Sequence, residues 1–193
     1  MPRVKLFDEQ EVLTKAMELF WKKGYHATSM DELVKFLGIS RASLYGTFGG
    51  KKELFTKALA HYRTTNNHVI QRFFSNQTNV KEGLKKLFYN LIEESSTDKD
   101  YKGCFVVNTT TELIPGDDEM KKTLLDNKVT FYRMFYSFLL QGVQEGQVSA
   151  EKDIKTIANL LYTFFNGFRV ITKISTDIQE LQKSVDTMLS LLD

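Results

Sequence analysis

Hydroxyl, phenol and cationic side chains gather between residues 28 and 51 of this chain, at a spacing that suits a nucleic acid. Phosphate contacts set the register of a protein on DNA, and contacts to base edges specify the sequence. Hydroxyls at helix N-termini and a lysine suit phosphates, whereas an arginine can pair in bidentate fashion with guanine. The candidates for DNA contact are Thr28, Ser29, Ser40, Arg41, Ser43, Tyr45, Thr47 and Lys51.

The elements that must position these side chains are two short helices joined by a tight turn. Gly38 lies at the turn, where the reversal needs a residue free to take a positive φ. Ser40 is a good N-cap for the second helix, in which Leu44 and Phe48 point inward. The polar residues of that helix then face away from the core. The pattern predicts a helix-turn-helix whose second helix fits a DNA major groove.

Two features leave alternatives open at this interface. Thr28, Ser29 and Ser40 could serve as helix caps alone. Tyr45 could lie against the rim of the core. Gly46 lies inside the recognition helix and costs about 1 kcal/mol of helix propensity against alanine. We therefore expect this helix either to read fewer bases or to order fully only on DNA.

The N-terminal part resembles the DNA-binding domain of the tetracycline-repressor (TetR) family of bacterial transcription regulators, over about residues 8–60. The residues that carry the resemblance are Gly24, Tyr25, Thr28, Ser29, Met30, Leu33, Gly38, Ile39, Ser40, Leu44, Tyr45, Phe48, Lys51, Leu54 and Phe55. The resemblance implies that Thr28, Tyr45 and Lys51 contact the DNA backbone and that the recognition helix reads bases. It also implies a homodimer and a small-molecule pocket among the central helices.

Helical periodicity dominates the chain, which holds two prolines and few alternating patterns. Helices are expected over about residues 8–23, 28–37, 40–48, 51–74, 80–95, 102–112, 118–145, 150–175 and 177–192. We predict an all-α fold with a helix-turn-helix domain at residues 1–50 and a larger ligand-binding and dimerisation domain at residues 51–193. The helix near 51–74 should bridge the two parts rigidly.

The last two expected helices carry apolar stripes with heptad-like spacing. In the family these helices of two subunits usually form a four-helix bundle, so the resemblance implies a dimer seam. The alternative is that the stripes form the core of a single chain. The candidates for the dimer interface are Leu161, Phe164, Phe168, Ile178, Leu181, Val185, Met188 and Leu192.

The central helices are rich in phenylalanine. A small-molecule pocket needs mostly apolar walls with a few polar groups, although aromatic stripes more often form core. The candidates for ligand contact are Cys104, Phe105, Asn108, Phe135, Asn166 and Arg169.

Cys104 is the only cysteine, which excludes an intrachain disulfide and a cysteine-built zinc site. It follows Lys102 and Gly103 at an expected helix start, where the helix N-terminus and the cation both favour the reactive thiolate. An alternative function is therefore a thiol switch that responds to electrophiles or oxidants. The competing interpretation is a small buried hydrophobe.

Composition and charge set broader bounds. The chain is 42% hydrophobic, yet no apolar run approaches the ~20 residues that span a bilayer, and the N-terminus lacks the apolar core of a secretory signal. We expect a cytoplasmic protein. Residues 1–52 carry a net charge of +3 and the rest carries −1, which agrees with phosphate contact by the N-terminal part. Arg3 and Lys5 could form a short basic arm.

The sequence shows no Ser/His/Asp set, no metal-ligand spacing and no phosphate-cradling glycine motif. We expect no enzyme, no cofactor and no metal site. The predicted function is a DNA-binding transcription regulator, a repressor that binds a palindromic operator as a homodimer and is released by a small-molecule inducer. A helix-turn-helix interaction module without sequence-specific DNA binding is a further alternative.

Overall fold

The computed structural model describes residues 7–175 and 177–193, and within them the chain is helical without strands. The predicted arm at Arg3 and Lys5 lies outside the described residues. The helices are α1 (Glu9–Lys23), α2 (Met30–Leu37), α3 (Arg41–Phe48), α4 (Lys51–Ser75), α5 (Val80–Thr97), α6 (Phe105–Leu113), α7 (Asp118–Gln144), α8 (Ile154–Ile171) and α9 (Ile178–Leu189), followed by a 3-10 turn, Ser190–Leu192. The predicted all-α fold is confirmed. None of the described helices is both long and apolar enough to cross a membrane.

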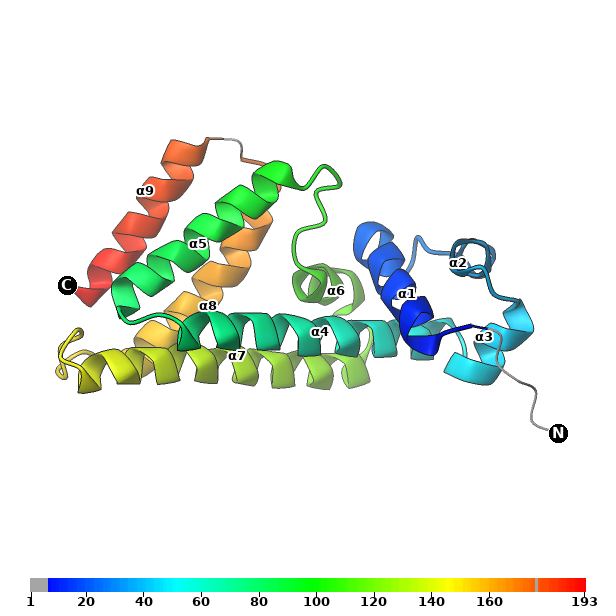
Figure 1. Ribbon diagram of the computed structural model, residues 1–193, viewed down its shortest axis with the longest axis horizontal. Helices are drawn as coiled ribbons and strands as arrows, with labels where there is room; N and C mark the ends of the chain where they lie inside the picture. Colours follow the sequence, from blue (N-terminus) through cyan, green and yellow to red (C-terminus); the bar gives the residue numbers. More distant parts are fainter. Residues whose placement is uncertain (1–6, 176) are drawn as a thin grey trace.

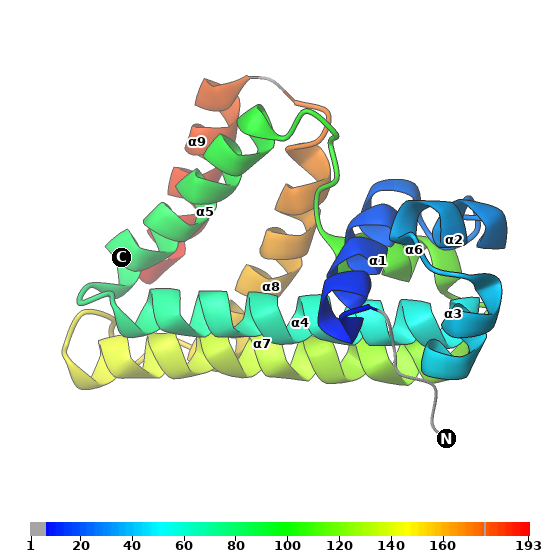
Figure 2. The ribbon, with the colours of Figure 1, turned by 45° about the vertical axis from the view of Figure 1, so that its right-hand side comes forward.

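The long helices α4 and α7 lie side by side along the long axis of the molecule, with α1, α2 and α3 at one end and α5, α8 and α9 at the other (Figures 1 and 2). Two cores of buried side chains follow this division. Leu54 and Phe55 of α4 belong to the core beneath α1–α3, and Ile70 and Phe74 belong to the core among α5, α7, α8 and α9. Because one helix contributes to both cores, the two ends are joined rigidly.

The three N-terminal helices are short because the sequence caps each of them. Ser29 Oγ accepts the backbone N–H of Glu32 at the start of α2. Gly38 ends that helix with φ at 69°, in the left-handed region that strains other residues. Ser40 Oγ then accepts the backbone N–H of Ser43 at 3.0 Å and caps the start of α3. The predicted turn is therefore formed by residues that lie close together in the sequence.

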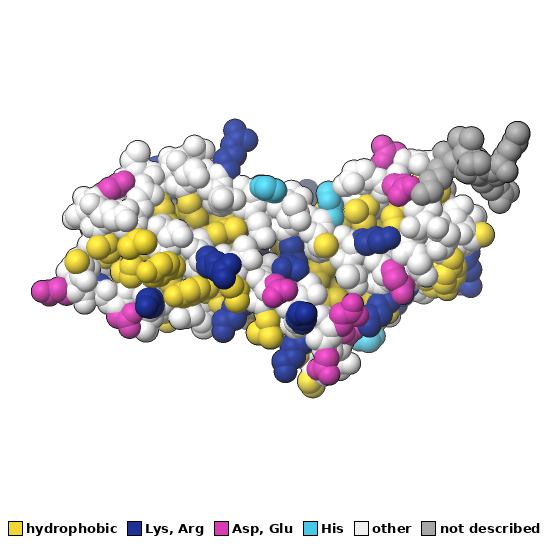
Figure 3. All heavy atoms as spheres, turned by 90° about the horizontal axis from the view of Figure 1, so that it is seen from below, with side chains coloured by type: hydrophobic (Ala, Val, Ile, Leu, Met, Phe, Trp, Pro, Cys, Tyr) yellow, Lys and Arg dark blue, Asp and Glu magenta, His cyan; other side chains and the backbone are white. Residues whose placement is uncertain are grey.

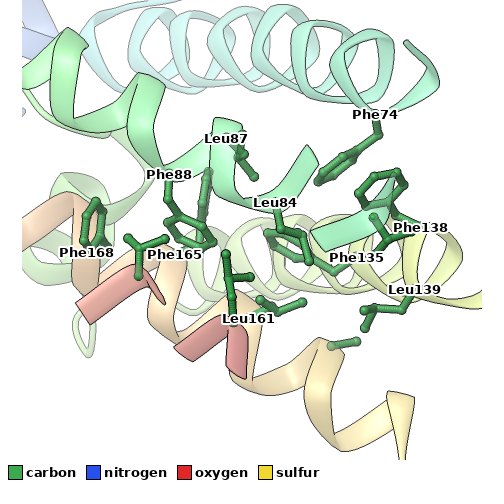
Figure 4. Close-up of a cluster of buried hydrophobic side chains, with 14 of the residues drawn as sticks. Phe74, Leu84, Leu87, Phe88, Phe135, Phe138, Leu139, Leu161, Phe165 and Phe168 are labelled. Carbon is green, nitrogen blue, oxygen red and sulfur yellow. The ribbon is translucent and has the colours of Figure 1, made fainter. Parts of the chain in front are cut away.

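The phenylalanine-rich region of the C-terminal part is a packed core (Figure 4). Phe88 meets the rings of Phe164, Phe165 and Phe168 edge-on, with ring centroids 5.2 to 6.2 Å apart. Edge-to-face pairs add about 0.5–1.5 kcal/mol to the gain from area burial. The rings therefore fill the space between α5 and α8 rather than line a pocket there.

Two predicted helix starts shift for local reasons. Helix α8 begins at 154 instead of 150, because Asp153 accepts the N–H of Thr156 and caps it there. Helix α6 begins at 105 instead of 102, because Asp98 ties up the N–H groups of Asp100 and Lys102 in a loop. Helix α8 also ends at 171, four residues before the predicted end.

Helix α3 is continuous through Gly46, so the expected weak point does not break it. A Cβ at Gly46 would have nothing within 4 Å, and its φ is not in the positive region. We expect Gly46→Ala to raise the free energy of unfolding by about 0.5–1 kcal/mol, from helix propensity alone. Urea unfolding followed by circular dichroism measures this. Unchanged or lower stability would show that the backbone at this position is strained in a way the geometry does not reveal.

Candidate nucleic-acid interface and adjoining cavity

Helix α3 presents one outer face to solvent. Leu44 and Phe48 are buried and fix the opposite face against α1, α2 and α4. Arg41 and Tyr45, one turn apart, are exposed, and the exposed fraction of Tyr45 is 52%. The sequence prediction for these two residues placed them correctly on the surface.

The remaining predicted α3 contacts lie at the flank of this face. Ser43 and Thr47 are only partly exposed, whereas Ala42 and Gly46 are exposed beside Arg41. Ala42 was missed by the sequence reasoning, although its place three residues before Tyr45 on a helix indicates the same face. A small apolar side chain there can approach a thymine methyl group.

Arg41 has an ion-pair partner within the chain. Its guanidinium donates to the carboxylate of Asp31 on α2 at 2.6 Å, and both side chains are largely exposed. An exposed pair of this kind contributes little to stability, about 0–1 kcal/mol. Asp31 therefore orients Arg41 at the DNA face and also competes with any base or phosphate for it.

Of the two hydroxyl residues before α2, only one is exposed. Ser29 is exposed at the helix N-terminus, where it can meet a phosphate. Thr28 is fully buried, and its hydroxyl donates to the carbonyl of Gly24 at 2.6 Å. The structure therefore corrects the expectation for Thr28: its side chain fastens the turn between α1 and α2 and does not reach the surface.

The N-terminus of α4 has no side-chain cap. Its N-cap is Gly50, which offers no side chain to accept the first N–H groups. Lys51 stands at this end with its Nζ 4.4 Å from the ring centroid of Tyr25. A lysine beside uncapped amides is a suitable phosphate clamp. Together with Ser29 and the α3 face, this gives the arrangement of base and phosphate contacts that DNA binding requires.

Two carboxylates from the C-terminal part hold the N-terminal helices in place. Glu112, near the end of α6, accepts the backbone N–H groups of Tyr25 at 2.9 Å and His26 at 2.7 Å. Asp117, the N-cap of α7, lies 3.0 Å from Lys52 at the start of α4. The backbone N–H of Met120 and the charge of Lys52 hold the pKa of Asp117 below its usual range. Helices α6 and α7 are thus linked to the DNA-binding helices by charge-assisted contacts.

Glu112 was missed by sequence reasoning. A carboxylate in the last turn of a helix opposes the helix dipole, and that unfavourable position was the available signal for a partner elsewhere. Its contact with Tyr25 spans 87 residues, so no local pattern identifies the partner.

A cavity of about 730 Å³ lies between α1, α4, the end of α5, the loop at 98–103 and the end of α8. Its walls include Trp21 and Tyr62, whose ring centroids are 4.8 Å apart, and the cations Lys102, Arg169 and Lys173. The size is within the range of about 300–1,000 Å³ that small-molecule sites occupy.

The six predicted ligand residues are not brought into one pocket. Phe105 and Phe135 are buried in separate cores, and neither lines the cavities beside Arg169. The amide of Asn108 donates to the carbonyl of Lys102 at 2.8 Å and braces the loop. The other three, Cys104, Asn166 and Arg169, line a space of about 10 Å³. Of these three, only Arg169 also lines the large cavity.

Cys104 is buried, with 5% of its surface exposed, and packs between α4 and α8. The phenol of Tyr62 lies 3.8 Å from its Sγ, and Arg169 is close enough to donate to the thiol. Burial is the largest single influence and raises the pKa of the Cys104 thiol, but the charge of Arg169, the N–H of Val107 and the hydrogen bonds of Arg169 and Tyr62 together hold that pKa below its ordinary value. Burial raises the pKa of Tyr62. The group that favours the thiolate of Cys104 is therefore Arg169, and not Lys102 as the sequence had suggested.

The predicted dimer stripe lies largely inside the single chain. Five of its eight residues are buried by the chain's own helices, which corrects their assignment to a surface: Leu161, Phe168, Leu181, Val185 and Leu192. Ile178 is exposed, and Phe164 and Met188 are partly buried. The exposed apolar residues of α8 and its C-terminal end follow a neighbouring stripe: Leu160, Val170, Ile171 and Ile174.

The underside of the molecule differs from the α3 face. Lys and Arg are interspersed there with Asp and Glu, and apolar side chains gather toward the end away from α1, α2 and α3 (Figure 3). A face of mixed charge does not suit a phosphate backbone.

Comparison with known proteins agrees with this geometry. Residues 12–58 match the family described as bacterial regulatory proteins, tetR family, and residues 81–188 match the tetracyclin repressor-like C-terminal domain. The chain is 32% identical to the uncharacterized HTH-type transcriptional regulator YezE of Bacillus subtilis, over 100% of both chains. It is 31% identical to the HTH-type transcriptional repressor ComR of Escherichia coli, over 98% of this chain and 90% of ComR.

Among solved structures, a cysteine-substituted form of the TetR family regulator CifR, complexed with a 26 bp double-strand operator DNA, superposes with a TM-score of 0.87. The two chains are 26% identical, and the superposition covers 99% of this chain and 100% of the CifR chain. The reduced form of NemR from E. coli has a TM-score of 0.85 at 15% identity, with coverage of 95% and 96%, which shows a shared fold.

Proposed function

This chain belongs to the tetR family of bacterial regulatory proteins, and from that premise we propose that it is a transcriptional repressor that binds a palindromic operator as a homodimer and is released by a small molecule. The observation that carries the proposal is the exposed α3 face, with Arg41, Ala42 and Tyr45 outward and the uncapped N-terminus of α4 beside it. Residues 1–50 act as the DNA-binding part and residues 51–193 as the ligand-binding and dimerisation part.

Two copies are needed to read an operator with useful selectivity. One recognition helix fits one major groove, and dimers of such motifs bind half-sites about 34 Å apart. The operator in the CifR complex is 26 bp long, about two and a half turns of DNA, which exceeds the reach of a single helix. A second copy supplies the other recognition helix.

The stripe beside the buried face of α8 is the surface that we assign to the second copy. Leu160, Ile171 and Ile174 are exposed apolar residues on this stripe, with exposed fractions of 42%, 46% and 77%. A Cβ at Gly167, between them, would have nothing within 4 Å, so another helix can approach closely there. Ile178 extends the surface onto α9. In this proposal the bundle forms from α8 and α9, as predicted, but from a different face of α8.

Release of DNA requires that the two parts communicate. Helix α6 begins at the buried thiol of Cys104, next to the cavity wall, and ends at Glu112, which holds the turn between α1 and α2. A ligand that favours one position of α6 therefore shifts the DNA-binding helices, provided that its affinity differs between the two positions.

We expect Glu112→Gln to weaken this link. Hydrogen bonds to a charged group contribute about 1.5–3 kcal/mol, so the free energy of unfolding should fall by about 1–3 kcal/mol. Operator DNA should slow amide hydrogen exchange in α6 of the wild-type chain, and this protection should be lost in the variant. Glu93→Gln, an exposed glutamate of α5, is the matched control and should behave as wild type. Full protection of α6 in Glu112→Gln would show that the contact does not transmit.

The proposed function is tested by selecting bound fragments from random DNA at several salt concentrations. We expect a palindromic consensus, with affinity that falls steeply as salt rises, because several phosphates are neutralised by each copy. Weak binding without a consensus would contradict the proposal and support an interaction module that does not read sequence.

A thiol switch is the second candidate, favoured by the guanidinium of Arg169 beside Cys104. N-ethylmaleimide tests it, because the thiolate adds to the alkene carbon, forming an S–C bond, and a proton from water completes the adduct. We expect the reagent to lower operator affinity at least tenfold in the wild-type chain and to leave Cys104→Ser unaffected. Equal operator affinity of the treated and untreated wild-type chain would make the thiol a structural group.

A further inference from the structure

The cavity of about 730 Å³ has an electrostatic character that indicates what fills it. Four cations contribute to its wall: Lys99, Lys102, Arg169 and Lys173. In the described part of the chain, none of the four forms an ion pair with a carboxylate. Cations that line a cavity without counter-ions favour an anionic occupant.

The carboxylates of the same wall are already engaged or stand apart. Asp100 pairs with Lys22 at 2.7 Å, and that contact holds the pKa of Asp100 below its usual range. Asp98 accepts the backbone N–H groups of Asp100 at 3.2 Å and Lys102 at 2.6 Å. Glu94 is exposed and forms no ion pair in the described part of the chain, although its charge reaches Arg169 and helps to raise the pKa of that guanidinium. Because these contacts occupy the carboxylates of Asp98 and Asp100, the wall presents a net positive charge to the cavity.

Arg169 offers free donors to this space. Its guanidinium has five N–H groups, and the groups near it in the described chain include the Cys104 thiol, the Tyr62 phenol and the ring of Phe165, 4.5 Å from Cζ to the ring centroid. Across the described residues, Oδ1 of Asn67 is the one buried side-chain atom without a hydrogen-bond partner. The unpaired N–H groups of Arg169 are therefore not sealed in the core, and they reach the open space that Arg169 lines.

Another part of the wall suits an apolar body, and Lys102 Nζ lies at its edge, 4.9 Å from the ring centroid of Trp21. Trp21 and Tyr62 stand together there, and Leu91 adds an aliphatic surface. The indole of Trp21 is fixed, because its Nε1–H donates to the carbonyl of Gly103 at 3.1 Å. The stem of Lys173 packs against the same Gly103, where a Cβ would lie 2.7 Å from the lysine Cδ. Trp21 and Lys173 are thus both held against Gly103.

We propose that the ligand of this cavity is an organic carboxylate with an apolar body, its carboxylate held by Arg169 with Lys173 and Lys102 nearby and its body placed against Trp21 and Tyr62. This inference rests on the proposed function in one respect, that a ligand regulates the chain. The binding site itself stands on the cavity alone.

Trp21 is the only tryptophan of the chain and lines the cavity, so its fluorescence reports occupation directly. Two matched pairs of probes separate charge from shape: 4-phenylbutanoate with 4-phenylbutan-1-ol, and octanoate with octan-1-ol. We expect both carboxylates to change the emission of Trp21 with affinities at least tenfold above those of their alcohols, as a guanidinium–carboxylate pair requires.

Arg169→Gln should lower carboxylate affinity at least tenfold and leave the affinity for the alcohols unchanged. Lys173→Gln should act in the same direction more weakly, and it tests the site if Arg169→Gln does not fold. Arg72→Gln, an exposed arginine of α4 outside the cavity, is the matched control and should bind as wild type.

Equal affinity for acid and alcohol would overturn the proposal, as would unchanged carboxylate binding in both cavity variants. So would the absence of any Trp21 response to both carboxylates at millimolar concentration. Failure of the proposed function is seen separately, in DNA selection without added ligand. Carboxylate binding in a chain that selects no operator would keep the site and remove its regulatory role.

Discussion

Ile171→Glu is expected to abolish operator binding by separating the two copies of the chain. Ile171 is 46% exposed in the α8 stripe, so the single chain should tolerate the change. In a two-fold interface each substitution appears twice and meets its own symmetry mate. Burying unpaired carboxylates costs several kcal/mol, so we expect dimerisation to weaken by more than about 100-fold. Operator affinity should fall by at least as much, because one recognition helix remains per complex.

Sedimentation and fluorescence anisotropy with operator DNA measure these two losses, and circular dichroism confirms that the helices persist. The matched control is Val69→Glu, which places the same charge on an exposed valine of α4. The control should remain dimeric and bind DNA normally. A dimeric Ile171→Glu chain would show that the second copy sits elsewhere.

Arg41→Ala is expected to have the second largest effect. A bidentate contact between arginine and guanine is worth about 1–3 kcal/mol of discrimination, and a dimer makes it twice. Affinity for the operator should fall by about 10- to 100-fold for each contact, with sequence preference relaxed at one position of each half-site. Loss of affinity by the same factor on every sequence would instead make Arg41 a phosphate contact.

The partner of Arg41 supplies a matched variant. Asp31→Asn leaves Arg41 in place and removes the carboxylate that holds it at 2.6 Å. Because the exposed pair contributes little to folding, stability should change by less than about 1 kcal/mol. Affinity for DNA should rise, since Arg41 is released and one negative charge leaves the interface. A rise confined to sites that keep the base read by Arg41 would indicate base readout, whereas an equal rise on every sequence would indicate a general effect of charge.

The DNA-binding helices could be predicted from sequence because each is defined by residues close together in the chain. Ser29, Gly38 and Ser40 act on backbone groups within four positions, so their roles follow from type and spacing. Thr28 was misplaced for the same reason, because its burial depends on packing rather than on a local signal. Spacing identifies a cap more readily than it identifies exposure.

The dimer surface could not be predicted in the same way. Periodicity shows that one face of a helix is covered, but it does not show whether the cover comes from the same chain. Leu161 and Phe168 contact the chain's own core, whereas Leu160 and Ile171, next to them on the helix, remain exposed. Helix α8 is apolar on both faces, and the stronger stripe belongs to the core.

The groups around the cavity join residues far apart in the sequence. Trp21, Tyr62, Cys104 and Arg169 come from four separate segments and meet only in the fold. No pattern in the sequence gives their distances, and the abundance of phenylalanine directed attention to a region that is solid core. The site that binds ligand in our proposal is marked by unpaired cations instead.

The most direct test of the account is the stoichiometry and footprint of the complex on a selected DNA site. We predict two chains per duplex, measured by the mass of the complex, and protection of two major grooves on one face of the DNA, with centres about one helical turn apart. One chain per duplex, or protection confined to a single groove, would contradict the paired recognition helices on which the proposed function depends.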